Sequence, residues 1–319
     1  MRSHSRRHLD NDGQRSADDL RWLGLLSVVL VVASACGEVR PPCPSCSARD
    51  GEPVTLDGGS ESGVTPPDGS LPELTLGARV VFWVGAHPDD ESMVAPLMSD
   101  WCSRTRCVFL VLTRGEGGHC GLPSGCAPSL GAVRTLEMQA SARLFGADLV
   151  QETFANASST AQQARDVWVN EAGSESALVE RVARVMRAER ADLVVTLDPL
   201  HGGTCHGEHR AAGVVALAAA ESATIPRSRV LLVSSVLTVE TPTAPSAIGF
   251  LPPSGGEATW SFSGGTWQRL ADVMRTHASQ FSSELVAAAA SAPPRLRTSY
   301  FRTAESVRAS DALDTRYCP

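Results

Sequence analysis

The chain contains no lysine: all 28 of its positively charged side chains are arginines, and 35 acidic side chains outnumber them. Without lysine the chain cannot form a Schiff base with a substrate, hold pyridoxal phosphate covalently or build a P-loop. The net charge of −7, with no clustered basic stripe, argues against binding to nucleic acid. Whatever chemistry the chain performs must therefore rest on other side chains.

Apolar runs long enough to span a bilayer are also missing. The longest run near the amino terminus, Leu23 to Ala33, has 11 residues, whereas a spanning helix needs about 20. Small residues and then Cys36 follow this run, a pattern that resembles a bacterial lipoprotein signal; an ordinary cleaved signal peptide is the alternative. We expect a lipoprotein-type signal over residues 1–36, a lipid anchor at Cys36 and a flexible Pro/Gly/Ser-rich tether over 37–76. The protein would then lie outside the cytoplasm, in the bacterial cell envelope.

Cysteine usage agrees with export. Of nine cysteines, eight remain when Cys36 is set aside, and they favour disulfides in an oxidising compartment. The preferred pairs are Cys102 with Cys107 and Cys120 with Cys126. A bond between Cys205 and Cys318 would tie the carboxyl terminus to the loop that precedes His206. Cys43 and Cys46 have the spacing of a redox pair, but they lie in the tether rather than at a helix start, which disfavours that interpretation.

Strand and helix patterns alternate along residues 77–319. The expected strands are 79–85, 106–113, 148–154, 192–197 and 229–239, and the expected helices are 91–101, 129–145, 175–190, 208–222 and 266–290. Residues 155–174 read as an irregular polar stretch and 241–265 as a long loop. This alternation predicts an α/β domain with a Rossmann-like, mostly parallel sheet and helices on both faces.

Histidines and carboxylates gather at the ends of two expected strands. His87 and Asp90 follow the first strand at a spacing of three residues, and Asp89 lies between them. The spacing lets His87 and Asp90 reach one metal ion and leaves Asp89 for proton transfer. His206 and His209, also three residues apart, follow the strand at 192–197. Open α/β sheets bind ligands at this edge, so a metal site is expected there.

The glycine-rich segment 114–121 invites a nucleotide-binding interpretation. Its glycines are out of register with GxGxxG, and it does not lead directly into a helix. We therefore expect no nucleotide cofactor.

The two motifs resemble those of the LmbE-like, or PIG-L, zinc de-N-acetylase family. The segment 86–91, Ala-His-Pro-Asp-Asp-Glu, is similar to the family signature, and 206–209 is similar to its His-Pro-Asp-His motif, with Gly207 and Glu208 in place of Pro and Asp. Two weaker family marks are Arg134 with Glu137 and the His-Ala-Ser-Gln segment at 277–280. The resemblance covers about residues 77 to 282.

This resemblance implies an enzyme that removes an N-acetyl group from an amino sugar or glycoconjugate. It assigns Zn²⁺ to His87, Asp90 and His209. The remaining implied roles are Asp89 as general base, His206 as acid and oxyanion donor, Glu208 as the group that orients His206, and Arg134 as a substrate contact. His201, His277 and Asp198 are left without an assigned role.

Two alternatives stay open. The chain could be a lipoprotein that binds zinc or glycans without turnover, or a zinc amidohydrolase that acts on a substrate other than a sugar. The sequence does not identify the substrate, because the loops 114–128, 155–174 and 241–265 carry no readable code.

Overall fold

A computed structural model describes residues 77–156, 160–240, 247–253, 260–307 and 318. The expected signal segment over 1–36 and the tether over 37–76 lie outside the described residues, as do Cys36, Cys43 and Cys46. No helix in the described part of the chain is long and apolar enough to cross a membrane.

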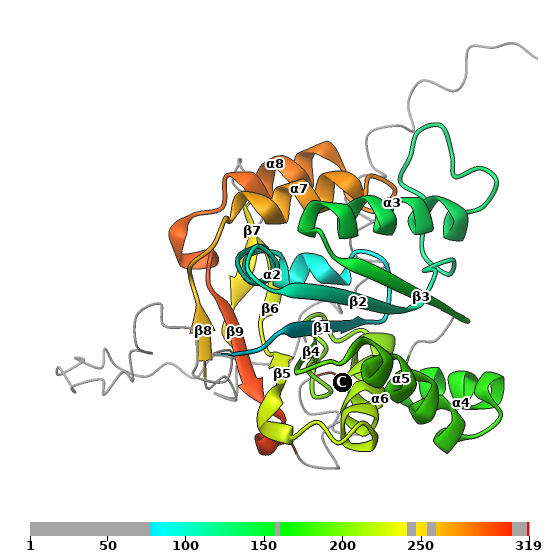
Figure 1. The fold of residues 1–319 in the computed structure, drawn as a ribbon. Coiled ribbons are helices and arrows are strands. Elements are labelled where there is room, and N and C mark those ends of the chain that lie inside the picture. Colours follow the sequence, from blue (N-terminus) through cyan, green and yellow to red (C-terminus); the bar gives the residue numbers. More distant parts are fainter. Residues whose placement is uncertain (1–76, 157–159, 241–246, 254–259, 308–317, 319) are drawn as a thin grey trace, which may run out of the picture. The chain divides into compact units, whose positions relative to one another are not determined.

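A seven-stranded sheet runs through the domain in the order β3-β2-β1-β4-β5-β9-β8 (Figure 1). Its strands are β1 (Val80–Gly85), β2 (Arg106–Thr113), β3 (Asp148–Phe154), β4 (Leu193–Leu197), β5 (Val230–Val233), β8 (Trp260–Phe262) and β9 (Ser299–Thr303). The strands from β1 to β5 pair in parallel, whereas β9 is antiparallel to both β5 and β8. The predicted mostly parallel α/β sheet is confirmed.

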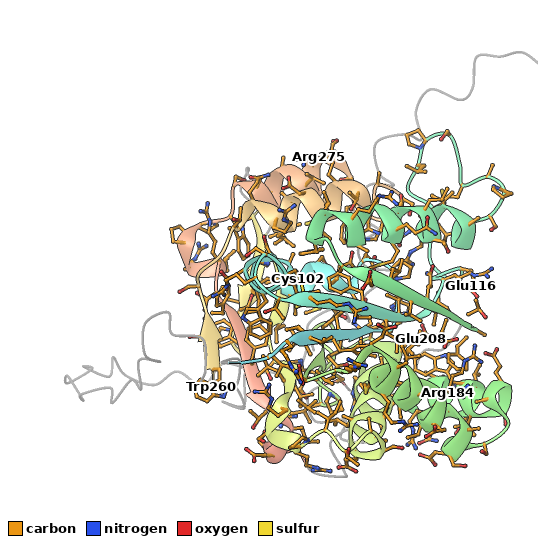
Figure 2. The ribbon with its side chains drawn as sticks, in the orientation of Figure 1. Cys102, Glu116, Arg184, Glu208, Trp260 and Arg275 are labelled. Carbon is orange, nitrogen blue, oxygen red and sulfur yellow. A yellow bond between two sulfur atoms is a disulfide. The ribbon has the colours of Figure 1, made fainter. Side chains whose placement is uncertain are left out.

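Helices cover both faces of this sheet (Figure 1). One layer contains α2 (Ala95–Cys102), α3 (Leu130–Phe145), α7 (Gln268–Thr276) and α8 (Ser283–Ala290); the other contains α4 (Ala161–Ala172), α5 (Glu175–Glu189) and α6 (Gly207–Ser222). Cys102 and Arg275 lie in the first layer, Arg184 and Glu208 in the second (Figure 2).

The alternation of side chains along β1 creates two separate cores. Val81 and Trp83 pack with α2, α3, α7 and α8, whereas Phe82 and Val84 pack with α4, α5 and α6. Every residue of β1 is buried. This agrees with a central parallel strand whose two faces are covered, and it explains why the sequence shows a continuous apolar run there.

Several elements differ from the sequence prediction. The polar stretch 155–174 contains the helix α4, capped by the Thr160 side chain, and the expected loop 241–265 contains the strand β7 (Ala247–Leu251), which pairs with β6 (Val236–Glu240) in a second sheet. The expected strand 229–239 is two strands, β5 and β6, and β9 was not expected at all.

The expected helix 266–290 is interrupted. It forms α7 and α8, separated by a turn over residues 277–282. Ser282 caps α8 through its side chain, which accepts from the backbone N–H of Leu285. This local hydrogen bond starts a new helix, where the helical periodicity alone had predicted one continuous element.

The two preferred disulfides and the bond between Cys205 and Cys318 are all present. Cys102–Cys107 lies at the end of α2, Cys120–Cys126 closes the loop between β2 and α3, and Cys205–Cys318 ties the carboxyl-terminal end to the loop before α6.

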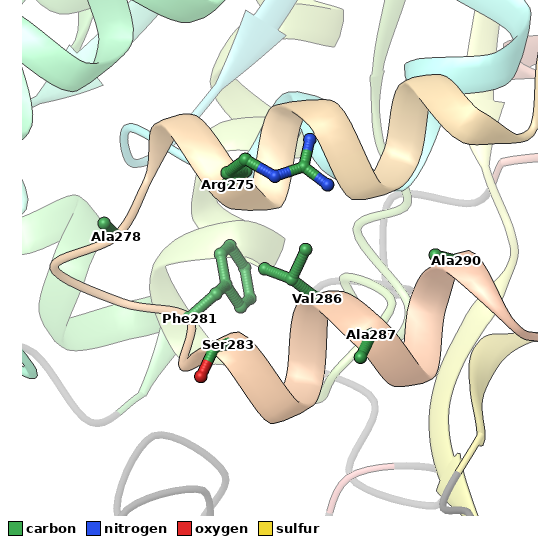
Figure 3. Close-up of a pocket in the computed structure, with 7 residues that line it drawn as sticks. All are labelled: Arg275, Ala278, Phe281, Ser283, Val286, Ala287 and Ala290. Carbon is green, nitrogen blue, oxygen red and sulfur yellow. The ribbon is translucent and has the colours of Figure 1, made fainter.

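A hollow of about 460 Å³ lies between α7 and α8 (Figure 3). Its lining is mostly apolar: Arg275, Ala278, Phe281, Ser283, Val286, Ala287 and Ala290. None of the histidine and carboxylate groups of the two motifs lines this hollow, so we assign no chemistry to it.

Candidate active site

The two motifs meet at the carboxyl edge of the sheet, where β1 lies between β2 and β4. The strand order changes direction at this point, and such switch points are where open α/β sheets bind ligands. The loop after β1 is held by Asp90, whose Oδ2 accepts hydrogen bonds from the backbone N–H groups of Ala86 (2.7 Å) and His87 (2.9 Å). Both of these hydrogen bonds use Oδ2, so Oδ1 of Asp90 is left for other contacts.

Glu208, in the first turn of α6, fixes the orientation of His87. Its Oε2 lies 2.5 Å from His87 Nε2, and its side chain is fully buried. A carboxylate oxygen can only accept, so Nε2 carries the proton and Nδ1 carries the lone pair. The sequence had assigned Glu208 to His206 and did not predict this hydrogen bond to His87. The role of Glu208 toward His206 stays a prediction.

His209 is oriented by backbone. Its Nδ1 lies 2.9 Å from the carbonyl oxygen of Gly202, which can only accept a hydrogen bond. Nδ1 therefore carries the proton, and the lone pair is on Nε2. Thr204 Oγ1 lies 3.1 Å from the same Nδ1.

Three lone-pair atoms now converge. His209 Nε2 lies 3.0 Å from Asp90 Oδ1 and 3.2 Å from His87 Nδ1, and the last two atoms are 3.6 Å apart. When both rings are neutral, in the tautomers above, each of the three atoms offers a lone pair to a metal ion. Without a metal ion, His87 also holds a second proton, which a bound metal ion would displace. The ligands of a tetrahedral Zn²⁺ with bonds of 2.0–2.1 Å lie about 3.3 Å apart. The separations and the donor set therefore fit a zinc ion.

The charge balance of this cluster also favours a cation. Burial lowers the pKa of His87, but Asp90 and Glu208 outweigh it and raise that pKa to about 9. Burial raises the pKa of Asp90, but His209 and His87 outweigh it and hold the pKa well below its usual value. The pocket thus stabilises positive charge beside an ionised carboxylate.

His206 brings a third ring nitrogen to the cluster, within 4.8 Å of those of His87 and His209. Two sets of possible metal ligands therefore share His87 and His209 and differ in the third member. Asp90 fits better as that member, because its Oδ1 lies closer and its other oxygen is fixed by the backbone.

The ring of His206 is held in a neutral state. Burial first, and then the neighbouring His209 and His87, lower its pKa to about 3. Among the described residues, its Nδ1 has no hydrogen-bond partner. A neutral His206 can donate or accept a hydrogen bond at pH 7, and it can act as an acid only after it has taken up a proton.

Asp89 occupies a strained position beside the ligands. Its φ of 110° lies in the left-handed region, which costs a non-glycine residue about 1–3 kcal/mol. Its side chain is 19% exposed, against 2% for Asp90, so Asp89 can meet water. Burial raises the pKa of Asp89, and the nearby Arg134 opposes that shift.

The side chain of Arg134 forms an ion pair with Asp89 and is not directed into solvent. This buried arginine on α3 lies 2.9 Å from Asp89 Oδ1 and donates to the carbonyl oxygens of Pro88 and Gly115. The sequence had assigned Arg134 to the substrate. The guanidinium is only 5% exposed and has three acceptors around it, so in this structure it holds Asp89 in place. The substrate contact stays a prediction.

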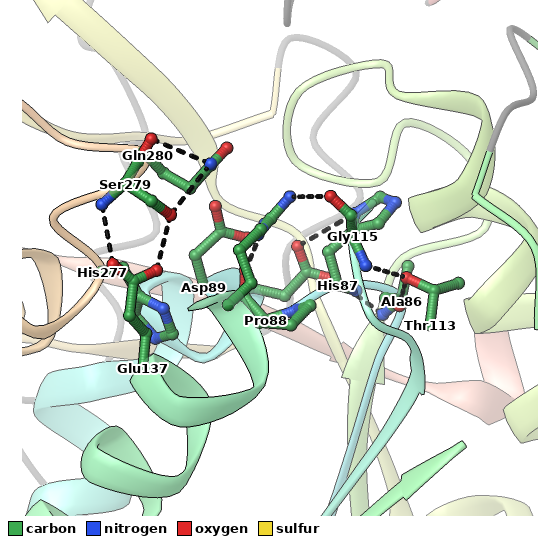
Figure 4. A network of polar contacts seen from close by, with 12 residues as sticks. Ala86, His87, Pro88, Asp89, Thr113, Gly115, Glu137, His277, Ser279 and Gln280 are labelled. Carbon is green, nitrogen blue, oxygen red and sulfur yellow. Dashed lines mark hydrogen bonds and ion pairs between the residues drawn. The ribbon is translucent and has the colours of Figure 1, made fainter. Parts of the chain in front are cut away.

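Glu137, one turn further along α3, holds the turn between α7 and α8. Its two carboxylate oxygens accept from Ser279 N (2.8 Å) and Ser279 Oγ (2.6 Å). Gln280 Nε2 also donates to Ser279 Oγ (3.2 Å), and Figure 4 shows Glu137, Ser279 and Gln280 side by side. Gln280 donates to the carbonyl oxygen of His119 as well, and the N–H of Gly121 donates to that of Ser279. The two weak sequence marks therefore belong to one network, which fixes the disulfide-closed loop beside the site.

His277 and Glu91 form a buried ion pair next to the backbone of Asp89. His277 Nε2 is 2.6 Å from Glu91 Oε1, and both side chains are fully buried. Glu91 also accepts from Ser141 Oγ and, at 3.1 Å, from the backbone N–H of Asp89. His277 therefore supports the loop that carries Asp89 and does not face the metal ligands directly.

Asp198, His201 and His119 lie outside the cluster of candidate ligands. Asp198 is fully buried, where it accepts both arms of the Arg302 guanidinium (2.6 and 2.7 Å) and the Ser234 hydroxyl (2.8 Å). It anchors β9 to the loop after β4. His201 lies 3.8 Å from Asp198, in the same loop. His119 is exposed in the disulfide-closed loop.

Sequence reasoning missed Asn156. It follows β3, and its amide lies against Glu208 and 3.2 Å from His87 Nε2. Its place just after a parallel strand was the signal that could have identified it, because β3 ends at the same edge as β1 and β4.

One known protein family is similar to the part of the chain that carries this site. The family model described as PIG-L: GlcNAc-PI de-N-acetylase matches residues 82–220. No curated protein sequence matches the chain.

One solved structure shows a similar fold, and others are similar to a lower degree. The N,N'-diacetylchitobiose deacetylase from Pyrococcus horikoshii is 15% identical, with a TM-score of 0.51 over 73% of this chain and 86% of that one. The zinc-inhibited form of teicoplanin deacetylase Orf2 is 14% identical, with a TM-score of 0.47 over 72% and 100%. The 4-carboxy-2-hydroxymuconate hydratase GalB from Pseudomonas putida KT2440 is 15% identical, with a TM-score of 0.45 over 70% and 95%.

The likeness to the chitobiose deacetylase, at 15% identity, concerns the fold alone. The residues 82–220 that match the PIG-L, or LmbE-like, family model include both histidine motifs and the strands that bring them together.

Proposed function

We propose that this protein is a zinc-dependent hydrolase that removes an N-acetyl group from an amino sugar or glycoconjugate. The observation that carries the proposal is the convergence of His87 Nδ1, Asp90 Oδ1 and His209 Nε2 within 3.0–3.6 Å of one another, with Asp89 alongside. The match of residues 82–220 to the PIG-L family model supports the reaction type.

His87, Asp90 and His209 would hold the zinc ion. When bound, Zn²⁺ supplies Lewis acidity: it polarises the amide carbonyl and lowers the pKa of water to about 7. Three protein ligands leave the fourth tetrahedral position open, as catalytic zinc sites require.

Asp89 is the proposed general base. It is the carboxylate of the site that reaches solvent, and Arg134 holds it in place. As water attacks the amide carbon, Asp89 accepts one proton; the carbon–nitrogen bond then breaks and the amine nitrogen takes up a proton. The products are acetate and a free amine.

His206 is proposed to act at the acetyl carbonyl and at the leaving amine. Its ring centroid lies 4.9 Å from that of His87 and 4.8 Å from that of His209, so it borders the ligands. As a neutral imidazole it can donate a hydrogen bond to the developing oxyanion. To serve as the acid it must first accept the proton that Asp89 removes from water.

We also propose that the enzyme works outside the cytoplasm, anchored at Cys36. Three disulfides in the described residues support an oxidising compartment, because such bonds rarely persist in the cytosol. Labelling with radioactive palmitate, compared between the full chain and its Cys36→Ala variant, tests the anchor: label in both or in neither would contradict it.

The reaction is tested with a protein that comprises residues 37–319. Metal content is measured first, and acetate release is then followed from a panel of N-acetylglucosamine glycosides beside Asp89→Asn, which keeps size but removes the base. We expect one zinc per chain in both proteins and acetate release only in the parent.

The other outcomes select the alternatives. Stoichiometric zinc without acetate release from any sugar, but with hydrolysis of non-sugar amides, would identify a different amidohydrolase. Zinc binding without any turnover would indicate a binding lipoprotein. Absence of bound metal would overturn the proposed mechanism.

A further inference from the structure

Asn156 joins three parts of the site that are far apart in the sequence. Its Oδ1 accepts from the backbone N–H of Gly117 (2.9 Å), and its Nδ2 donates to Glu208 Oε2. The same Nδ2 lies 3.2 Å from His87 Nε2. The amide therefore bridges the glycine-rich loop after β2, the first turn of α6 and the loop after β1.

The partners of this amide determine which way it points. The Gly117 N–H can only donate, and the Glu208 carboxylate, which receives the His87 N–H, can only accept. An amide is the side chain that offers one acceptor and one donor at these two places. A carboxylate at position 156 would instead face Glu208, which is fully buried, with a second negative charge.

The backbone around Asn156 is fixed as well. The indole N–H of Trp168 donates to the carbonyl oxygen of Ala155 (3.0 Å), and the Glu171 carboxylate accepts from the Ala155 N–H. A Cβ at Gly117 would lie 1.9 Å from the Asn156 carbonyl oxygen, so only glycine allows the loop to come this close. The contact between Asn156 and Gly117 is therefore fixed by the backbone of both segments.

We propose that Asn156 is a positioning residue that orients the zinc ligand His87 through Glu208 and links that orientation to the glycine-rich loop. This inference deepens the proposed function and rests on its metal site. Groups that orient a metal-bound histidine raise metal affinity and activity by about 10–100-fold. Asn156 acts indirectly: it fixes the Glu208 carboxylate, which in turn orients His87.

The first experiment measures zinc affinity by competition with a chromophoric chelator, in Asn156→Ala, Asn156→Asp and Glu208→Gln. We expect Asn156→Ala to weaken zinc binding about 10-fold and Asn156→Asp to weaken it further. The double variant Asn156→Ala/Glu208→Gln should lose no more than Glu208→Gln alone, because both act along one path.

Gln151→Ala is the matched control. Gln151 lies on the same strand, β3, and its amide donates to the Thr113 carbonyl oxygen (3.1 Å) instead of the site. This variant removes a similar amide hydrogen bond, and its zinc affinity should equal that of the parent. Thermal unfolding of every variant shows whether the fold is retained.

A second readout does not depend on metal. In the zinc-free protein above about pH 9, where the His87 ring becomes neutral, ¹⁵N chemical shifts report which ring nitrogen keeps its proton. We expect Nε2 to keep the proton in the parent and in Gln151→Ala, and a mixture of the two tautomers in Asn156→Ala. An unchanged tautomer together with unchanged zinc affinity in Asn156→Ala would overturn the inference.

The failure of this inference is separable from failure of the proposed function. If Asn156→Ala raised KM alone, with zinc affinity unchanged, Asn156 would be a substrate contact and the inference would be wrong while the reaction stood. If the variants behaved as expected but the parent released no acetate, the positioning role would stand and the proposed reaction would fall.

Discussion

Arg134 and Asp89 form an ion pair of 2.9 Å between helix α3 and the loop after β1. The arginine belongs to a motif that the sequence assigned to the substrate, and the aspartate is the proposed base. Because the two are bound to each other, the position and the charge of the base depend on a helix that begins about 40 residues later in the chain.

Replacement of Arg134 by Gln should impair the base. Arg134 lowers the pKa of Asp89, against the effect of burial, so removal of its charge raises that pKa. The base must be deprotonated, and the acidic limb of the pH–rate profile should therefore move up by about 1 pH unit. The measurement is kcat/KM between pH 5 and 9. Arg143→Gln, an exposed arginine on the same helix, is the control and should leave the profile unchanged.

The His277–Glu91 pair should make stability depend on pH. Burial lowers the pKa of His277, but Glu91 outweighs it and the pKa is raised; burial raises the pKa of Glu91, but His277 outweighs it and the pKa is lowered. The stabilisation by His277 is complete below its unfolded pKa of about 6.5 and is lost as pH rises through its folded value. The stabilisation by Glu91 is complete above its unfolded pKa of about 4.5, and it is lost as the pH falls through the lower pKa that Glu91 has in the folded protein.

His277→Gln should therefore be most destabilising between about pH 4.5 and 6.5, by about 3 kcal/mol. Urea unfolding of the zinc-free protein across pH 4 to 9 measures this difference. The double variant Glu91→Gln/His277→Gln should recover part of the loss, because no buried charge is left unpaired. A difference that grew with rising pH would contradict the assigned pair.

Removal of a ligand should abolish metal binding without unfolding the domain. His209→Ala deletes Nε2 from the cluster of three lone-pair atoms, and we expect the zinc content to fall from one per chain toward zero. His119→Ala, an exposed histidine outside the cluster, should keep its zinc. Metal content by atomic emission measures both.

Zinc should also stabilise the parent thermally. At a free zinc concentration 100 times Kd, binding adds about 2.7 kcal/mol to the free energy of unfolding. The rise in Tm seen with the parent should be absent in His209→Ala. A similar rise in that variant would place the zinc elsewhere.

The disulfide Cys205–Cys318 should stabilise the domain more than Cys102–Cys107. The first joins residues 113 apart and the second joins residues 5 apart. Chain entropy alone gives about 5 kcal/mol for the long loop and about 2 kcal/mol for the short one. Paired Cys→Ala variants, compared by urea unfolding, test this order. Cys205 also precedes His206, so loss of the long-range bond should reduce kcat more than loss of the short one.

Much of the fold was predictable because its signals are local. Apolar runs of strand length, glycine and serine at helix ends, and cysteines five or six residues apart each report on neighbouring residues. Gly146 ends α3 as expected, in the left-handed conformation. The predictions failed where local signals were weak, as in α4, whose sequence is mostly polar, and in β8, which has three residues.

The buried face of α3 shows a further limit. Helical spacing highlights Leu136, Ala140 and Leu144, yet Leu136 is 65% exposed and the buried face carries Arg134, Met138 and Phe145. Periodicity gives the repeat of a helix but not its rotation about its axis. Here the rotation agrees with the contact between Arg134 and Asp89 and with packing of Phe145 on Phe109.

The sequence by itself determined the class of fold, the two histidine motifs and the residue types that can hold a metal. The tertiary structure alone decided which groups meet. It brings Glu208 to His87, Arg134 to Asp89, and Asn156 to the site. The reason is physical. A hydrogen bond between residues 46 to 121 positions apart depends on how helices rotate and strands align, and no local pattern in the chain encodes that geometry.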